Sequence, residues 1–162
     1  VLDAGGEQPG GLRLLRLSLE VEIAERHPRR ALHVLVDVGD GQASLLVAQL
    51  AGRLDDQAQA LGYDIDFRQS NHEGHLVDWL HEAQSVGAKA VLLNAGAYTH
   101  TSIALHDAIK SIKVPVIEVH LSDPHKREAF RHISYVGMAA HSCVAGHGAK
   151  SYELALDAAA QL

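Results

Sequence analysis

The chain has 162 residues, of which 47% are hydrophobic and 21% are charged, and this length fits one globular domain but is tight for two. It carries 14 Lys and Arg against 20 Asp and Glu, a formal net charge of −6, which argues against nucleic acid and anionic membranes as partners because both select a basic surface. A single cysteine excludes an intrachain disulfide and a cysteine-based zinc cluster. Because the sequence has neither a bilayer-length apolar run nor a signal-peptide pattern, it predicts a cytoplasmic protein.

The first 30 residues differ in pattern from the rest of the chain. Apolar and polar side chains alternate in residues 17–23, which favours an added strand, whereas three leucines within residues 12–15 leave a helix open. The sequence therefore predicts an N-terminal extension, residues 1–30, followed by an α/β domain, residues 31–162.

From residue 31 onward, short apolar runs alternate with stretches of helical periodicity. The strand-like runs are residues 33–36, 63–67, 88–93, 116–119 and 143–145. The helical stretches are residues 44–61, 76–86, 102–112 and 149–162. This alternation predicts a doubly wound, five-stranded parallel sheet with helices on both faces, and it places ligands beyond the carboxyl ends of the strands.

The second and third strands are each followed by a polar cluster on this rim. Residues 69–74 read Gln-Ser-Asn-His-Glu-Gly, and helix capping by Ser70 or Asn71 is their simplest interpretation. Residues 94–102 are dense in hydrogen-bonding groups suited to an oxygen-rich ligand. The alternative for this second cluster is again a helix cap, at Thr101 or Ser102.

The third polar cluster contains Glu118 and His120 at the end of the fourth strand. Residues two apart on a strand point to the same face, so the carboxylate can fix the tautomer of the imidazole, and the pair suits general acid–base catalysis. The alternative is a structural ion pair in the sheet. Arg127 and Arg131 follow on a predicted helical turn, suited either to a carboxylate ligand or to pairing with Glu128.

Other kinds of site receive little support. The His72–His75 and His120–His125 spacings are compatible with metal ligation, but there is no His-Glu-x-x-His motif or Cys/His array, so no metal is expected. Both glycine-rich phosphate-binding motifs are absent, which argues against a nucleotide. Cys143 lies in an apolar strand and is predicted to be a core residue rather than a nucleophile.

The three polar clusters, in this order on this predicted fold, resemble the type II 3-dehydroquinate dehydratases. The matching words are Phe-Arg-Gln-Ser-Asn-His-Glu-Gly at 67–74, Asn-Ala-Gly-Ala-Tyr-Thr-His-Thr-Ser at 94–102 and Glu-Val-His-Leu-Ser at 118–122. Residues 125–134 and 146–156 agree as well. The resemblance covers the chain from about Ser44 to its C-terminus.

The resemblance implies a flavodoxin-like fold and a homo-oligomer, a trimer or a dodecamer of trimers. It also implies the dehydration of 3-dehydroquinate to 3-dehydroshikimate, in the shikimate pathway of aromatic amino acid biosynthesis, without a cofactor. In the family, a tyrosine activated by an arginine removes the proton next to the ketone. A histidine then protonates the departing hydroxyl group.

Matching the motifs residue by residue makes His120 the general acid and Glu118 the residue that orients it. The resemblance further implies that Arg127 supports the active-site loop region and that Asp107 lies at a subunit contact beside the substrate. The residues implied to bind the hydroxyl groups and carboxylate of the substrate are Asn94, His100, Leu121, Ser122 and Arg131.

The sequence departs from the family pattern after the first strand. There the family has an Asn-Gly-Pro-Asn word, a lid that carries the arginine, and then the tyrosine. This chain reads Asp-Val-Gly-Asp-Gly-Gln at 37–42 and has no Arg or Tyr between residues 37 and 50. A carboxylate at Asp37 would also repel a developing enolate.

Two interpretations follow from this departure. The first is a dehydroquinase-like protein that binds a small polyhydroxy carboxylate and is catalytically impaired, since a missing general base typically costs a factor of about 100 to 10,000. The alternative is an active dehydratase whose missing groups come from the N-terminal segment or a neighbouring subunit.

Overall fold

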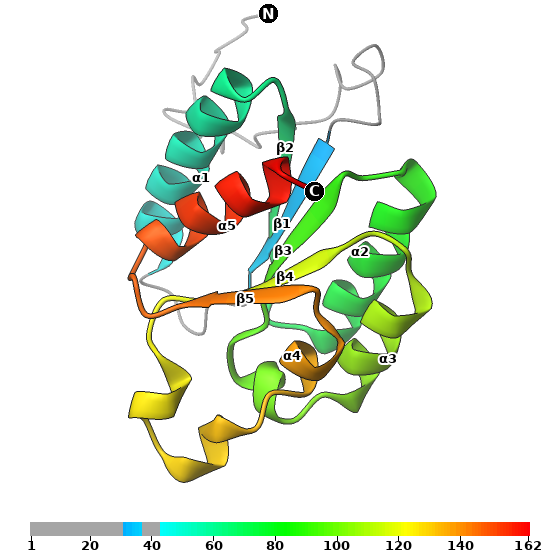
Figure 1. Cartoon of the computed structure of the whole chain (residues 1–162), viewed down its shortest axis with the longest axis vertical. Coiled ribbons are helices and arrows are strands. Elements are labelled where there is room, and N and C mark those ends of the chain that lie inside the picture. The colour runs from blue at the N-terminus through cyan, green and yellow to red at the C-terminus, as the bar shows by residue number, and fades with distance from the viewer. Residues whose placement is uncertain (1–30, 37–42) are drawn as a thin grey trace, which may run out of the picture.

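The computed structural model of the chain describes residues 31–36 and 43–162 (Figure 1). Five strands form one parallel sheet in the order β2-β1-β3-β4-β5, which confirms the predicted flavodoxin-like, doubly wound α/β fold. The predicted N-terminal extension, residues 1–30, and residues 37–42 lie outside the described residues. The strands are β1 (Ala31–Val36), β2 (Asp64–Gln69), β3 (Ala90–Asn94), β4 (Val116–His120) and β5 (Ser142–Ala145).

Helices cover both faces of the sheet (Figure 1). On one face lie α1 (Ala43–Ala60) and α5 (Lys150–Ala160), whose core contacts include Leu54 and Leu156. On the other face lie α2 (Glu73–Val86), α3 (Ile103–Ser111) and α4 (Tyr135–Ala139), with Leu80 and Leu105 in the core. Every residue of β3 and β4 is buried, as expected for central strands that are covered on both sides. Among the described residues, no helix is both long and apolar enough to cross a membrane.

The N-terminal ends of α2 and α3 show whether the polar clusters before them cap these helices. The Ser102 hydroxyl accepts a hydrogen bond of 2.8 Å from the Leu105 amide and caps α3, which is one of the two caps that the sequence offered as an alternative. Capping of α2 by Ser70 or Asn71 is wrong, because His72 occupies the N-cap position without a side-chain cap. The Ser70 hydroxyl instead accepts from the backbone amide of His72 at 3.0 Å.

The segment between β4 and β5 was not predicted in detail. It contains two short 3₁₀ turns, η3 (Pro124–Lys126) and η4 (Ala129–His132), followed by α4. Arg127 ends the first turn and Arg131 lies in the second, so the prediction that both sit on one helical turn is wrong. Turns this short carry no helical periodicity that a sequence pattern could reveal.

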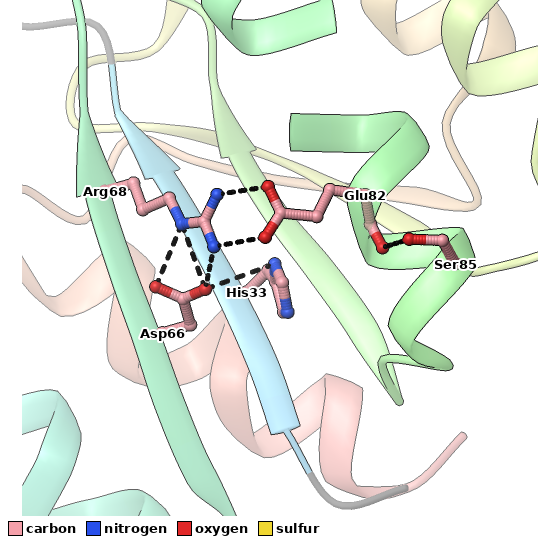
Figure 2. A network of polar contacts seen from close by, with 5 residues as sticks. All are labelled: His33, Asp66, Arg68, Glu82 and Ser85. Carbon is pink, nitrogen blue, oxygen red and sulfur yellow. Dashed lines mark hydrogen bonds and ion pairs between the residues drawn. The ribbon is translucent and has the colours of Figure 1, made fainter. Parts of the chain in front are cut away.

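A partly buried polar network links β1, β2 and α2 (Figure 2). Arg68 forms paired hydrogen bonds of 2.6 and 2.7 Å with Glu82 and also contacts Asp66. His33 is 2% exposed, and its Nδ1 lies 3.7 Å from the Asp66 carboxylate without a hydrogen bond. Burial lowers the pKa of His33 below its ordinary 6.5, aided by the Arg68 charge and opposed by the Asp66 and Glu82 charges.

This lowered pKa predicts a stability that depends on pH. As pH falls through 6.5, His33 takes up a proton in the unfolded chain but stays neutral in the folded chain. The free energy of unfolding therefore has its full His33 contribution above pH 6.5 and loses it as pH falls toward the lower pKa of the folded state. We expect the urea midpoint of His33→Leu to fall less steeply than that of the wild type over this interval. His81→Gln, at an exposed position, should keep the wild-type slope, and equal slopes in all three proteins would contradict the prediction.

Candidate active site

A pocket of about 310 Å³ lies where β3 and β4 end, the location expected for a ligand in a doubly wound sheet. Its walls come from η2 (Gly96–His100), the residues that follow β4, and the η3–η4 segment. The rings of His100 and His120 both line it and lie nearly parallel, with their centroids 6.5 Å apart. The lining residues are Asn94, Gly96, Ala97, His100, His120, Leu121, Ser122, Pro124, Arg127 and Arg131.

His120 and Glu118 form a buried pair at the end of β4. The Nε2 of His120 lies 2.9 Å from Oε1 of Glu118, and the two residues are 8% and 3% exposed. Because an ionised carboxylate only accepts hydrogen bonds, this contact places a proton on Nε2. Nδ1 is then the nitrogen left to exchange a proton with a ligand.

The carboxylate of Glu118 is held by more than His120. The Ser134 hydroxyl donates to Oε1 at 2.5 Å, and the Gly137 amide in turn donates to the Ser134 hydroxyl at 2.7 Å. A Cβ atom at Gly137 would come within 2.5 Å of the other oxygen, Oε2. Residue 137 therefore has to be glycine for α4 to approach the carboxylate this closely.

Two opposing effects set the ionisation of Glu118. Burial works to raise its pKa, but hydrogen bonds from His120, Ser134 and Cys143 outweigh burial and leave the pKa below its usual value. The carboxylate is thus ionised at neutral pH. It fixes the His120 tautomer as a hydrogen-bond acceptor and does not act as a proton donor.

Cys143 is not the core residue that the sequence predicts. It lies on β5 opposite Glu118 in the β4–β5 register, and its side chain is exposed. Because β5 is an edge strand, it has a neighbour on one side only and stays less covered than the central strands. Partial burial of the sulfur, together with the Glu118 charge, raises the pKa of the thiol to about 12, which agrees with the expectation that Cys143 is no nucleophile.

Asn94 and His100 are each oriented by a specific partner. The Asn94 amide donates a 2.8 Å hydrogen bond to the hydroxyl of Tyr152, a buried residue of α5, and its oxygen accepts from the Gly96 amide. Nδ1 of His100 lies 2.7 Å from the Ile133 carbonyl. Since a carbonyl accepts, Nδ1 carries the proton and Nε2 is an acceptor in the neutral ring.

Two arginines bring positive charge to the pocket. Nε of Arg131 donates to the Glu128 carboxylate at 2.9 Å, and Nε of Arg127 lies 3.5 Å from the same carboxylate. The sequence left open a carboxylate ligand or pairing with Glu128 for these arginines; both contact Glu128, and both also line the pocket. The guanidinium groups suit an anionic ligand, because they present several donors in one plane.

Six of the residues expected at the site come together in the pocket, with Glu118 directly behind His120. Asp107 does not line it and is exposed on α3. The sequence analysis did not identify Ser134 and Gly137 as neighbours of Glu118, or Tyr152 as the partner of Asn94. All three lie within the region of family resemblance, but their spacing does not show which side chain they contact. The six are Asn94, His100, His120, Leu121, Ser122 and Arg131.

The arrangement can bind a small polar anion and transfer a proton through His120. Among the described residues that line the pocket there is no tyrosine. The tyrosine nearest in sequence to the lining residues, Tyr98, donates its hydroxyl to the Asn71 carbonyl at 3.1 Å. The described lining residues therefore offer a proton-transfer group, His120, and a surface for an anion, with Arg127 and Arg131.

Known proteins share both the sequence and the fold. The profile of the family described as "Dehydroquinase class II" matches residues 40–160. The 3-dehydroquinate dehydratase of Maricaulis maris is 59% identical over 102 residues, covering 63% of this chain and 69% of the relative. That of Rhizobium meliloti is 55% identical over 114 residues, covering 69% of this chain and 75% of the relative.

Solved structures of dehydroquinases share the fold of this chain. The type II dehydroquinase from Propionibacterium acnes superimposes with a TM-score of 0.76 at 34% identity, covering 82% of this chain and 99% of the other. A 3-dehydroquinate dehydratase-like protein from Bifidobacterium longum gives 0.63 at 29% identity, covering 81% and 95%. With a sequence profile that matches three quarters of its length, this chain belongs to the class II dehydroquinase family.

Proposed function

We propose that this protein is dehydroquinase-like and catalytically impaired: it binds 3-dehydroquinate or a closely related polyhydroxy carboxylate and dehydrates it slowly. The family reaction is the conversion of 3-dehydroquinate to 3-dehydroshikimate in the shikimate pathway, and the proposal includes no cofactor and no metal for it. The observation that carries the proposal is the buried His120–Glu118 pair, which opens into a pocket with two arginines.

The proposed roles follow the geometry of the pocket. His120 supplies the proton that leaves with the hydroxyl group, and Glu118 holds its tautomer. Arg131 pairs with the carboxylate of the substrate, as a planar fork of donors is suited to do. Asn94, His100, Leu121 and Ser122 contact the hydroxyl groups, and Asp107 meets a neighbouring subunit.

The proposed impairment rests on the connection between β1 and α1. β1 ends at Val36 and α1 begins at Ala43, so six residues occupy the place where the family has its lid and base. Those residues carry no Arg or Tyr and include Asp37 and Asp40. The family profile itself begins to match only at residue 40, part of the way through this connection.

A second candidate function is an active dehydratase that obtains the missing groups elsewhere. Arginines at positions 13, 16, 26, 29 and 30 favour the N-terminal segment as a source of positive charge, but this segment has no tyrosine. A neighbouring subunit is the other source, in a homo-oligomer such as the family's trimer or dodecamer. The oligomer is proposed from family membership alone, and the cytoplasmic location predicted from the sequence is likewise kept as a proposal.

Calorimetric titration with 3-dehydroquinate tests the binding half of the proposal. We expect saturable binding by the wild type, weakened about 10- to 100-fold in Arg131→Ala because a charge-assisted hydrogen bond to the carboxylate is lost. Lys126→Ala removes the same charge from a side chain that is 83% exposed and should bind normally. Absence of binding by the wild type would refute the proposal.

A further inference from the structure

Three side chains of different chemistry meet on one side of the sheet, next to the pocket. The ligating atoms of Glu118, His120 and Cys143 all lie within 4.8 Å of one another. Glu118 and His120 are two residues apart on β4, so their side chains point to the same face of the sheet. Cys143 pairs with Glu118 across the β4–β5 ladder and projects from that face as well. The histidine pairs weighed in the sequence do not include this cluster.

We propose that Glu118, His120 and Cys143 form a site for a zinc ion. A thiolate, an imidazole and a carboxylate are the three ligand types that zinc takes in proteins. Three protein ligands leave the fourth tetrahedral position to water or to an anion in the pocket, which His120 also lines. The sequence predicts no metal here because the ligands come from two strands and match no metal-binding motif.

Most of the site is already in place in the folded chain. Glu118 is held by Ser134 and by the close approach of Gly137, so its carboxylate needs no ordering on binding. Ligands at bond lengths of 2.0–2.3 Å around a tetrahedral zinc lie about 3.5 Å apart. His120 Nε2 and Glu118 Oε1, which are 2.9 Å apart, therefore separate when the ion binds, and Cys143, on the exposed edge strand, moves toward them.

The charges balance when the ion binds. One carboxylate and one thiolate neutralise a divalent cation, and a neutral complex is the least costly to bury. Without metal, the Cys143 sulfur lies beside the Glu118 carboxylate and keeps its proton, because a thiolate next to a carboxylate is disfavoured. Binding releases this proton to solvent, while the Nε2 proton of His120 moves to Nδ1, so that Nε2 can coordinate.

Metal binding would also regulate the site. With zinc on Nε2, His120 cannot take up a second proton, so it is held as a neutral ring, which is a weaker acid toward a leaving group than the imidazolium. Zinc is then an inhibitor that competes with proton transfer. This consequence rests on the proposed function, whereas binding of the ion does not.

Cobalt(II) absorbance tests the site directly, because Cys143 is the only cysteine of the chain. We expect one cobalt per chain to give a thiolate-to-cobalt charge-transfer band that zinc abolishes by displacement. The band should be absent from Cys143→Ala and retained in His132→Ala, which removes an exposed histidine. A wild type without this band at millimolar cobalt would overturn the proposal.

A second variant distinguishes a three-residue metal site from cobalt bound by Cys143 alone. Glu118→Gln should weaken cobalt binding at least about tenfold, whereas unchanged affinity would show that Cys143 binds cobalt without the cluster and would also overturn the proposal. Circular dichroism checks that each variant is folded. The absorbance reports binding whether or not the protein turns over 3-dehydroquinate, so the two proposals can fail independently.

Discussion

Replacing His120 with alanine is expected to lower the turnover of 3-dehydroquinate by about 100- to 10,000-fold, the range typical of a lost general acid. His120 is the only pocket-lining group among the described residues whose second nitrogen is fixed by a buried carboxylate, at 2.9 Å. The loss should appear in kcat, because a proton donated to the leaving group acts in the transition state and not in the bound ground state.

Two comparisons make this result specific. His132→Ala removes an exposed histidine outside the pocket lining and should keep the wild-type rate. Calorimetry on His120→Ala should still detect 3-dehydroquinate, since Arg131 and Asn94 remain. If His120→Ala retained the wild-type kcat, another group would be the acid and the proposed role of His120 would be wrong.

Substituting Gly137 with alanine should have the second large effect. The added Cβ atom would meet Glu118 Oε2 at 2.5 Å and the Ser134 hydroxyl at 2.9 Å, and buried carboxylates cannot be displaced without losing their donors. We expect a loss of about 1–3 kcal/mol in the free energy of unfolding, the usual cost of overpacking. Turnover should fall as well, because a displaced Glu118 no longer orients His120.

Gly52→Ala is the matched control for this substitution. Gly52 lies inside α1 with nothing within 4 Å of the added Cβ, so alanine should stabilise the helix by up to about 1 kcal/mol. Urea denaturation of the two variants measures both changes. Equal stabilities for Gly137→Ala and the wild type would mean that α4 moves away from Glu118 at little cost.

The sheet could be predicted because its central strands are continuous or nearly continuous apolar runs in the sequence. The continuous apolar run that forms β3 marks a strand buried on both faces. β2 extends further than predicted, to Gln69, because Arg68 is polar yet half-buried in the network with Glu82. The five-residue helix α4 was missed, since one turn and a half carries no amphipathic signal.

The site was predicted only in part, and the reason is physical. The residues lining the pocket follow β3 and β4 directly, so motif and topology together place Asn94 and His120. The contacts that hold Glu118 depend on how α4 packs and on the β4–β5 register, which bring Ser134 and Cys143 to the same carboxylate. No local pattern encodes either of these tertiary contacts.

The impairment is tested most directly by kcat/KM for 3-dehydroquinate, measured through the enone absorbance of the product. The reference enzyme, assayed under the same conditions, is the Rhizobium meliloti relative, which is 55% identical over 114 residues. Without the lid and its base, we expect this protein to be at least about 100-fold slower. A kcat/KM within about tenfold of the relative's, lost in His120→Ala, would contradict the impairment and show that the missing groups are supplied from elsewhere.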